Sequence, residues 1–374
     1  MLPALVLIST LLQAREPHQN TLASQVVQAI DRNYLYADGP AWQHLRRQVL
    51  IANNADVSAL NRKLSALHDG NLRIVTSSQA KAIQAEGSGD EHGIGLVDFA
   101  LALEPGASEP RVVTPLIGSP AWLAGLLPRD EIVAVNGQKT RGLVHEDVMA
   151  LMRGDSGSLN LKIRRNGRLL TLQIPLKVWK EDAVVSRRMV AGQSRLAYVA
   201  IHLFTPESGD ATRQAVAAFV ADGIEGCIVD LRNNPGGYLG AMAIAGSAFT
   251  DQTLGWKVRR DHTREPILAD SKPLTKARLV VIVNEGTASA AEILAAGLRD
   301  EADAQIIGAK TYGRGQIQTY VQLSDNAGIA IPSANVESAR GTHFNKGSGL
   351  SPDIAVWTED DAAYREAIAL LTHG

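Results

Sequence analysis

The sequence predicts an α/β protein with a small β-rich module ahead of its main sheet and a helical segment before that module. Beyond residue 195, apolar strands alternate with helical stretches, and such alternation is typical of βαβ crossovers in a largely parallel sheet. Between residues 93 and 176 the pattern changes to short apolar runs punctuated by turn dipeptides. That second pattern is typical of an antiparallel β module.

Length and composition describe a globular chain of more than one module. Its 374 residues exceed what one hydrophobic core usually organises, and 45% are apolar while 20% are charged. The formal net charge is −2 and the basic residues are scattered, so no nucleic-acid-binding surface is predicted. We expect a signal peptide at 1–14, a helical region at 20–85, a β-rich domain at 90–178 and an α/β core at 190–374.

Neither a disulfide nor a metal site is predicted. The single cysteine, Cys227, stands in the apolar run Gly226–Val229, where a small buried side chain packs well. No zinc-ligand spacing occurs, and the nine histidines never pair at helical i, i+4 positions. We therefore expect no metal and no cofactor.

The first residues, MLPALVLISTLLQA, form one apolar stretch. The stretch is too short to span a bilayer comfortably as a helix, and it is similar to the core of a signal peptide with cleavage after Ala14. A basic region before the apolar core is missing, which leaves a short buried N-terminal segment as the alternative. We expect export to the periplasm or another extracytoplasmic compartment.

Apolar periodicity places the individual elements. The spacing of Val26, Ala29 and Ile30 predicts helix in the region 20–85. In the β-rich region we expect hairpin turns at Asn136-Gly137 and Asn166-Gly167 and short helices near 119–123 and 145–152. For the core we expect, in order, strand 196–204, helix 209–221, strand 226–231, helix 238–249, strand 277–283, helix 289–299 and strand 305–308.

A serine stands where a buried strand is predicted to turn into a helix. The apolar run Leu279–Val283 leads through NEGTA to Ser289, and a helical pattern follows. Such a position exposes the hydroxyl at the sheet edge while helix N–H groups point at an anion formed beside it, as acyl transfer requires. The alternative is a structural role as a helix N-cap, because Ser289 and Glu292 also match the S-x-x-E capping box of a helix N-terminus.

A glycine-rich loop follows the neighbouring strand. Its sequence is DLRNNPGG, from Asp230 to Gly237, directly after the apolar run at 226–229. Gly236 and Gly237 let the backbone approach a ligand closely and present N–H groups without a side chain in the way. For these glycines alone, a plain loop turn is the alternative.

Four runs occur in one order along the chain: IVDLRNNPGGYL, VNEGTASAAEILAAGLRDE, IIGAKTYGRGQIQ and GSGLSPDIAV. Each run alone is weak evidence for a family, but the four in this order resemble the carboxyl-terminal processing, or tail-specific, serine peptidases. The resemblance covers most of the chain from residue 93 onward. It implies a crotonase/ClpP-like α/β peptidase core and a serine endopeptidase that cleaves polypeptides near their C-termini.

The resemblance also implies roles for individual residues. Ser289 takes the place of the nucleophile, and Gln318 takes the place of the glutamine that orients the family's catalytic lysine. One N–H group of the Gly236-Gly237 loop, together with that of Ala290, would form the oxyanion hole.

The position of the family's lysine is where this chain departs from the pattern. In the register of the run TYGRGQIQ, that position is Arg314, and an arginine cannot be deprotonated at usable pH. Lys310, His202 and His343 are the alternative bases. If none of them serves, the chain is a peptide-binding or adaptor protein on a degenerate peptidase scaffold.

A second departure lies upstream of the β-rich region, at Leu67–Leu72. Relatives commonly carry an Asp-x-His motif there, whereas this chain has Asn71. The departure weakens any mechanism borrowed from the branch of the superfamily that uses histidine. The dipeptide Asp69-Gly70 favours a tight turn as the simpler interpretation.

The run Gly93, Ile94, Gly95 and Leu96 looks like the carboxylate-binding loop of PDZ domains, whose successive N–H groups hold a peptide's terminal carboxylate. The later runs GSPAWLAGL and DEIVAVNG resemble the same domain type. With Ile94 and Leu96 lining the pocket, polypeptides with apolar C-terminal tails are the expected partners. A glycine-rich hairpin of an unrelated β barrel is the alternative. The insert disfavours a third functional class, a crotonase-like acyl-CoA enzyme.

Overall fold

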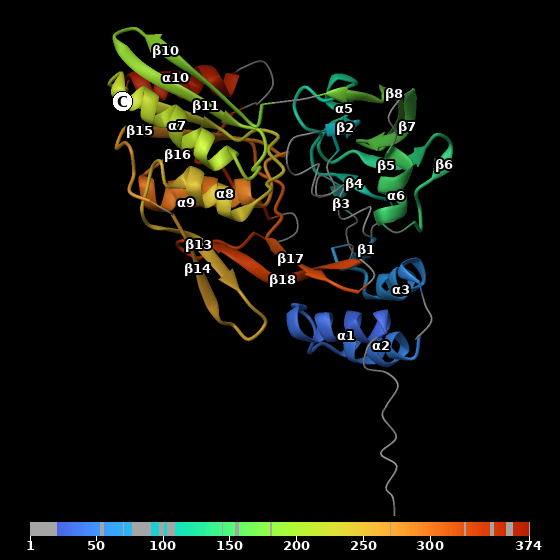
Figure 1. The fold of residues 1–374 in the computed structure, drawn as a ribbon. Helices are drawn as coiled ribbons and strands as arrows, with labels where there is room; N and C mark the ends of the chain where they lie inside the picture. Colours follow the sequence, from blue (N-terminus) through green and yellow to red (C-terminus); the bar gives the residue numbers. More distant parts are fainter. Residues whose placement is uncertain are drawn as a thin grey trace, which may run out of the picture.

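The computed structural model shows three regions (Figure 1). The described residues are 21–52, 56–69, 71–76, 91–96, 101–102, 109–143, 145–153, 157–179, 182–269, 271–324, 327–344, 348–356 and 362–373. The predicted signal peptide at 1–14 lies outside them. Within the described ranges, no helix combines the length and the apolar character that a bilayer crossing needs.

A six-stranded sheet forms the α/β core. In spatial order its strands are β10 (Val184–Ala191), β11 (Ser194–Ile201), β12 (Gly226–Asp230), β15 (Arg278–Val283), β16 (Gln305–Gly308) and β19 (Ile354–Ala355). The strands from β11 onward run parallel, and the edge strand β10 is antiparallel to β11. The predicted α/β core with a largely parallel sheet is therefore confirmed.

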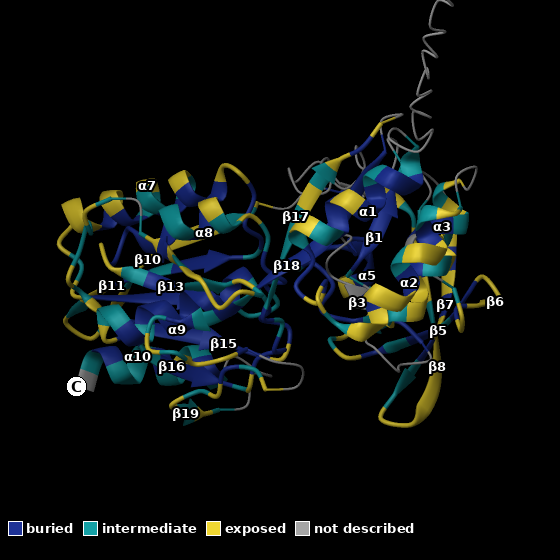
Figure 2. Ribbon diagram, turned by 90° about the horizontal axis from the view of Figure 1, so that it is seen from below, coloured by how far each residue is buried: buried dark blue, intermediate teal, exposed yellow. Residues whose placement is uncertain are grey.

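Helices cover both faces of this sheet (Figure 2). Three pack on one face, α7 (Ser208–Ala221), α8 (Leu239–Gly246) and α9 (Ala290–Ala302), and α10 (Ala362–His373) packs on the other. Because side chains alternate along a strand, Val229 and Val281 pack with the first group, and Ile228 and Val280 pack with α10. All four are buried, as the continuous apolar runs of these strands predict.

A second, antiparallel sheet is not predicted by the sequence pattern. Its path is β1 (Arg73–Val75), β18 (Gly328–Ser338), β13 (Thr253–Val258) and β14 (Arg264–Leu268), and β17 (Gln316–Gln322) also pairs with β18. β1 comes from the N-terminal region, whereas β17 follows Arg314 almost directly. This sheet therefore brings the N-terminal region to the edge of the core (Figure 1).

The N-terminal region is helical in its first part. Its elements are α1 (Leu22–Asn33), α2 (Pro40–Leu50), α3 (Val57–Leu64) and the 3-10 turn η1 (Ser65–Leu67). They share a core in which Trp42 is fully buried together with Ile329 of β18. The helical prediction for 20–85 is wrong at residues 73–75, which form β1, and its last part, 77–85, lies outside the described residues. A strand of three residues is too short for its periodicity to be detected.

The β-rich insert has a core of its own. Its sheet consists of β3 (Leu101–Ala102), β4 (Arg111–Val112), β5 (Glu131–Val135), β6 (Gln138–Lys139), β7 (Ser158–Arg165) and β8 (Arg168–Pro175), with helices α5 (Pro120–Leu123) and α6 (His145–Met152). β2 (Glu91–Gly93) and β9 (Lys177–Trp179) pair where the chain enters and leaves the insert. The insert contacts the core through Val113, which packs with Ala288 and Tyr312, and through the Arg129 guanidinium, 5.5 Å over the Tyr312 ring.

Candidate active site

Ser289 stands at the turn from β15 into α9. Its backbone has φ 54° and ψ −122°, a conformation with positive φ that costs a non-glycine residue about 1–3 kcal/mol. The helix begins at the next residue, Ala290, so the first N–H groups of α9 lie beside the serine. Ser289 is half-buried and lines a cavity. The strained turn therefore presents the serine to that cavity.

Hydrogen bonds join this turn to the glycine-rich loop after β12. The N–H of Asn233 donates to Asn284 Oδ1 at 2.9 Å, and Asn284 Nδ2 donates back to Asn233 Oδ1 at 3.0 Å. The hydroxyl of Thr287 donates to the carbonyl of Leu231 at 2.8 Å. These polar side chains connect the turn that carries the serine to the glycine-rich loop.

Gly236 packs directly against the serine. A Cβ on Gly236, whose φ is 108°, would lie 2.8 Å from the Cβ of Ser289 and 3.1 Å from the nitrogen of Ala290. Only a glycine permits this approach. The N–H of Gly236 donates to Asn234 Oδ1 at 2.8 Å, so it is already engaged and is not a ready donor to an oxyanion.

The neighbouring glycine, Gly237, has its N–H directed differently. The N–H of Phe204 donates to the carbonyl of Gly236 at 2.9 Å, and the N–H of Tyr238 donates to the carbonyl of Phe204 at 2.8 Å. In such a parallel bridge Phe204 lies on one side of Gly237, and the Gly237 N–H points to the other side. Gly237 and Ala290 both line the cavity with Ser289, which makes them the better pair of oxyanion donors.

Glu292 is a buried carboxylate that joins the serine to the loop carrying Arg314. Its Oε2 accepts from the N–H of Ser289 at 2.9 Å and from the N–H of Arg314 at 2.8 Å. Its Oε1 accepts from the N–H of Gly313 at 2.8 Å and from the hydroxyl of Thr311. Burial raises the pKa of Glu292, and the four donors oppose that shift. The capping interpretation thus holds for Glu292, and the same carboxylate also positions the Arg314 loop.

Replacing Glu292 by glutamine should destabilise the protein by about 2–4 kcal/mol, because the amide nitrogen would face two of the four donors inside the core. Urea unfolding followed by tryptophan fluorescence measures the loss. Glu285→Gln is the matched control, since Glu285 lies in the same turn but is exposed. Equal stability of the two variants would contradict the role assigned to Glu292.

Arg314 and Gln318 meet at Asn71. Nη2 of Arg314 donates to Asn71 Oδ1 at 3.1 Å, and Nε2 of Gln318 donates to the Asn71 carbonyl at 3.3 Å. Burial lowers the pKa of Arg314, while the nearby Tyr312 and Glu292 raise it. A guanidinium keeps its proton despite such a shift, so Arg314 is a fixed positive charge in the site.

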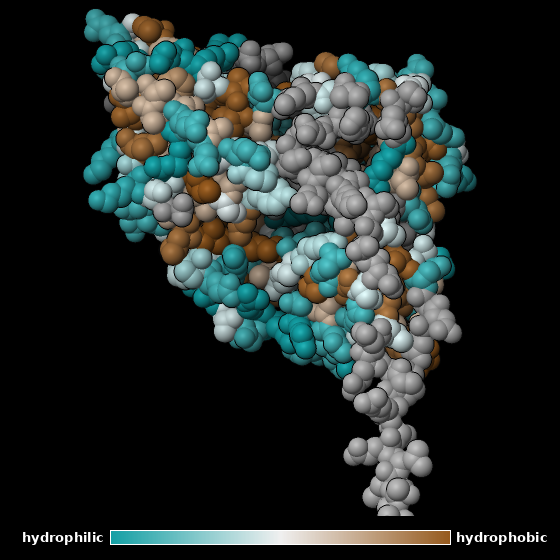
Figure 3. Space-filling model, in the orientation of Figure 1, coloured by the Kyte–Doolittle hydropathy of each residue, from teal (hydrophilic) through white to brown (hydrophobic). Residues whose placement is uncertain are grey.

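One cavity of about 350 Å³ gathers the predicted catalytic residues. Ser289, Arg314 and Gln318 line it together with Gly237 and Ala290. Most of its remaining lining is apolar, including Val75, Phe204, Leu239, Ile293 and Ile317. Figure 3 shows the surface recessed near the centre of this face, between the core and the two other regions.

The three alternative bases do not line this cavity. Lys310 and His343 are exposed, and His343 Nδ1 lies 3.5 Å from a carboxylate oxygen of Glu337. His202 is half-buried directly after β11. The titratable side chains among the described lining residues are two arginines and two tyrosines: Arg73, Arg314, Tyr238 and Tyr320. None of these residue types is a ready proton acceptor at neutral pH.

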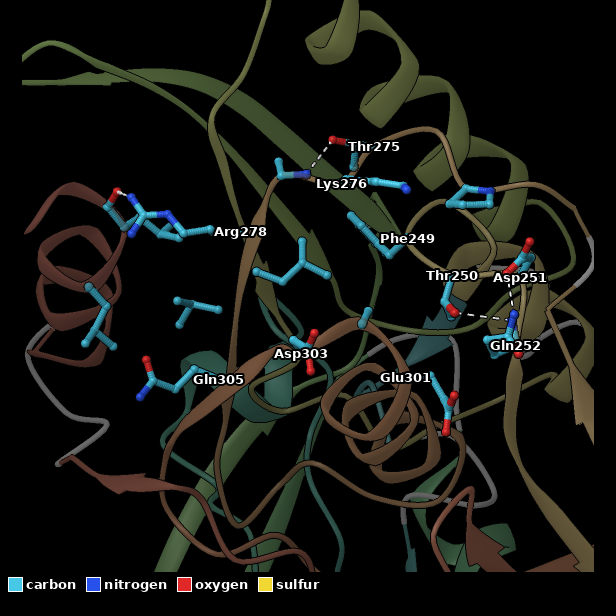
Figure 4. Close-up of a pocket in the computed structure, with 17 residues that line it drawn as sticks. Phe249, Thr250, Asp251, Gln252, Thr275, Lys276, Arg278, Glu301, Asp303 and Gln305 are labelled. Atoms are coloured by element: carbon cyan, nitrogen blue, oxygen red, sulfur yellow. Dashed lines mark hydrogen bonds between the residues drawn. The ribbon is translucent and has the colours of Figure 1, made fainter. Parts of the chain in front are cut away.

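A larger cavity, of about 800 Å³, lies at the opposite end of the core sheet (Figure 4). Arg278 and Gln305, the first residues of β15 and β16, line it together with Glu301 and Asp303 at the end of α9. No serine lines it, so of the two cavities only the smaller one contains the serine predicted to carry acyl transfer. Within the described ranges, no group of three or more His, Cys, Asp or Glu side chains is placed to hold a metal ion.

Comparison with known proteins identifies the family. The profile of peptidase family S41 matches residues 195–356, and that of the PDZ domain matches residues 111–165. A carboxyl-terminal-processing protease of Synechocystis is 32% identical over 336 residues, covering 85% of this chain and 77% of the relative. The chain belongs to the carboxyl-terminal-processing proteases of family S41. A further member, from Picosynechococcus, is 31% identical over 344 residues and covers 88% of this chain and 82% of its own.

The solved structures support the same assignment. The photosystem II D1 C-terminal processing protease matches with a TM-score of 0.81 at 29% identity, covering 93% of this chain and 96% of that one. Because S41 is a family of serine peptidases, this chain is a serine-type endopeptidase by family, with a PDZ domain inserted before its peptidase core. The predicted family and fold are confirmed, whereas the roles of single residues stay predictions.

Sequence reasoning misses part of the site. It names Asn71 only as a departure from the Asp-x-His motif, although Asn71 contacts both Arg314 and Gln318. It passes over Arg73, which lines the cavity and is buried. A signal for Arg73 exists, because it is a single charge within the otherwise apolar run Leu72–Val75. No local signal marks the contacts of Asn71.

Proposed function

We propose that this chain cleaves polypeptides near their C-termini through an acyl-enzyme on Ser289. The observation that carries the proposal is the convergence of Ser289, Gly237 and Ala290 on one largely apolar cavity. The serine oxygen attacks the scissile carbonyl, and the N–H groups of Gly237 and Ala290 stabilise the oxyanion. The apolar lining accepts an apolar side chain beside the scissile bond.

Arg314 contributes charge to this mechanism but does not accept a proton. A fixed cation beside Ser289 stabilises the negative charge that develops on the serine and carbonyl oxygens. Proton transfer from the serine hydroxyl is then left to solvent. Because a positioned general base typically contributes about 10²–10⁴ in rate, we expect slow cleavage of peptide bonds.

A second candidate function follows from the same cavity. Since the titratable residues among its described lining are arginines and tyrosines, the chain would in this case bind polypeptide tails without cleaving them. It would then act as an adaptor that retains the peptidase fold.

An activated ester separates the two functions. The p-nitrophenyl ester of N-acetyl-leucine has a leaving group that departs without protonation, so the serine can be acylated even when a base is lacking. We expect acid-quenched protein to gain one acyl group on the peptide that contains Ser289, detected by mass spectrometry. Absence of acylation at Ser289 would favour the adaptor.

The proposed tail-binding loop is hydrogen-bonded to the rest of the PDZ domain. The carbonyl of Ile94 accepts from the N–H of Ala121 at 2.8 Å, and that of Gly95 accepts from the N–H of Leu116 at 3.0 Å. The side chains of Ile94 and Leu96 are buried in the domain core. We propose that the loop from Gly93 to Leu96 binds the carboxylate of an apolar C-terminal tail.

The apolar N-terminal stretch supports an exported, extracytoplasmic location for this activity.

Replacing Gly95 by alanine should reduce the affinity for an apolar tail peptide at least about tenfold, because the tail is bound by N–H groups of this loop. Gly95 has φ +78°, and a Cβ there would lie 2.0 Å from the Cβ of Ser119. Gly137→Ala is the matched control, since Gly137 has φ +83° and open space around its Cβ position. Fluorescence anisotropy of a labelled peptide reports the affinity. Acylation of Ser289 by the small ester should be retained in both variants, and equal tail affinity of both would refute the loop assignment.

A further inference from the structure

Two arginines face the cavity that contains Ser289. Arg73 projects from β1 and is 5% exposed, and Arg314 precedes β17. The described residues that line the cavity include no aspartate or glutamate. Two guanidinium groups in a partly apolar lining favour an anionic ligand with an apolar body.

The backbone of Arg314 is linked to that of Ser289 through one carboxylate. Its N–H and that of Ser289 donate to the same oxygen, Oε2 of Glu292. Its guanidinium is oriented by Asn71, to which Nη2 donates at 3.1 Å. A guanidinium has five N–H donors in a planar fork that matches a carboxylate. Arg314 can therefore keep its bond to Asn71 and still bind an anion.

The proposed reaction creates such an anion at this place. In deacylation, water adds to the ester carbonyl and the bond from the carbonyl carbon to Ser289 Oγ breaks. The serine recovers a proton, and the product leaves as a carboxylate with release of a proton. The new carboxylate thus forms at the serine, within the cavity that Arg73 and Arg314 line.

We infer that this cavity is a product-carboxylate site, in which Arg314 and Arg73 hold the C-terminal carboxylate of a peptide that ends in an apolar residue. The inference rests on the proposed function for the origin of the carboxylate. A lysine that acts as a base is neutral when it does so, and would not bind the carboxylate in this way. The arginine at this position therefore makes the protein retain its cleaved product.

Occupancy of the cavity can be measured separately from binding to the PDZ domain. Ser289→Cys places one reactive thiol in the cavity, and the native Cys227 stays silent because it is fully buried and burial raises its pKa to about 12. The rate of alkylation by iodoacetamide, followed by mass spectrometry, then reports how far a peptide protects the cavity. The probes are N-acetyl-Ala-Ala-Leu as the free acid, its C-terminal amide, and N-acetyl-Ala-Glu-Leu amide.

We expect the free acid to protect the introduced thiol from alkylation at a concentration at least about tenfold lower than the amide needs, as charge-assisted pairing with arginine implies. In the Arg314→Gln background this preference should fall to about threefold or less. Arg168→Gln, at an exposed arginine of the PDZ domain, should leave the preference unchanged. Each ratio is taken within one variant, so a change in thiol reactivity does not affect it.

Equal protection by acid and amide, or a preference that survives Arg314→Gln, would overturn the inference. Protection by the glutamate-containing amide in place of the acid would also overturn it, because recognition would then belong to an acidic side chain. Failure of the wild-type protein to be acylated by the ester, with protection intact, would defeat the proposed function and leave the carboxylate site standing.

Discussion

Replacing Ser289 by alanine should abolish hydrolysis of both esters and polypeptides, with a loss of at least about a thousandfold in kcat/KM. The serine oxygen is the only protein atom that bonds to the substrate in the proposed mechanism, and no other serine lines the cavity among the described residues. Release of p-nitrophenol and electrophoresis of an unfolded polypeptide substrate measure the loss.

Stability should not change with this substitution. Alanine adopts φ 54° at a cost similar to that of serine, and the bond from the residue 289 N–H to Glu292 involves the backbone. Ser186→Ala, on the exposed edge strand β10, is the matched control and should retain full activity. Hydrolysis that persists in purified Ser289→Ala protein would falsify the assignment of the nucleophile.

The core of the fold can be predicted because its signals are local and strong. The strands at Gly226–Asp230 and Arg278–Val283 are continuous apolar runs bounded by turn residues, so their ends are predicted to within one residue. The second sheet lacks such signals. The sequence of β17 is QIQTYVQ, and most of its residues are half-buried. Its pairing with β18 depends on tertiary contacts, which no local sequence pattern predicts.

The residues of the candidate site likewise differ in whether a local sequence signal marks them. Ser289, Gly236 and Gly237 belong to short motifs that require a turn and a close backbone approach, so the sequence alone points to them. The contact of Asn71 with Arg314 joins residues 243 positions apart, and no periodicity encodes it. The sequence also leaves both glycines as candidate oxyanion donors. In the structure the N–H of Gly236 is already bonded to Asn234, so Gly237 is the better candidate.

In the proposed mechanism Arg314 stands where the family resemblance implies the catalytic lysine, so the rate of catalysis should depend on this position. Burial is the largest influence on the pKa of Arg314 and lowers it. A lysine placed there would experience the same desolvation, and a lysine pKa can move by several units when the charge is buried. The environment that cannot deprotonate a guanidinium can therefore deprotonate an ammonium group.

Replacing Arg314 by lysine should raise the rate of peptide-bond cleavage by about 10²–10⁴, the usual contribution of a general base. The gain should grow with pH through the lysine's pKa, because the neutral amine is the form that accepts the serine proton, whereas the wild-type rate should show no such inflection. Initial rates on a fluorogenic peptide across pH 6–10 test both expectations. Arg314→Gln removes the charge without supplying a base and should show no gain. If the lysine variant is no faster than the glutamine variant at any pH, proton transfer is not what this site lacks, and the adaptor function becomes the better account of the cavity.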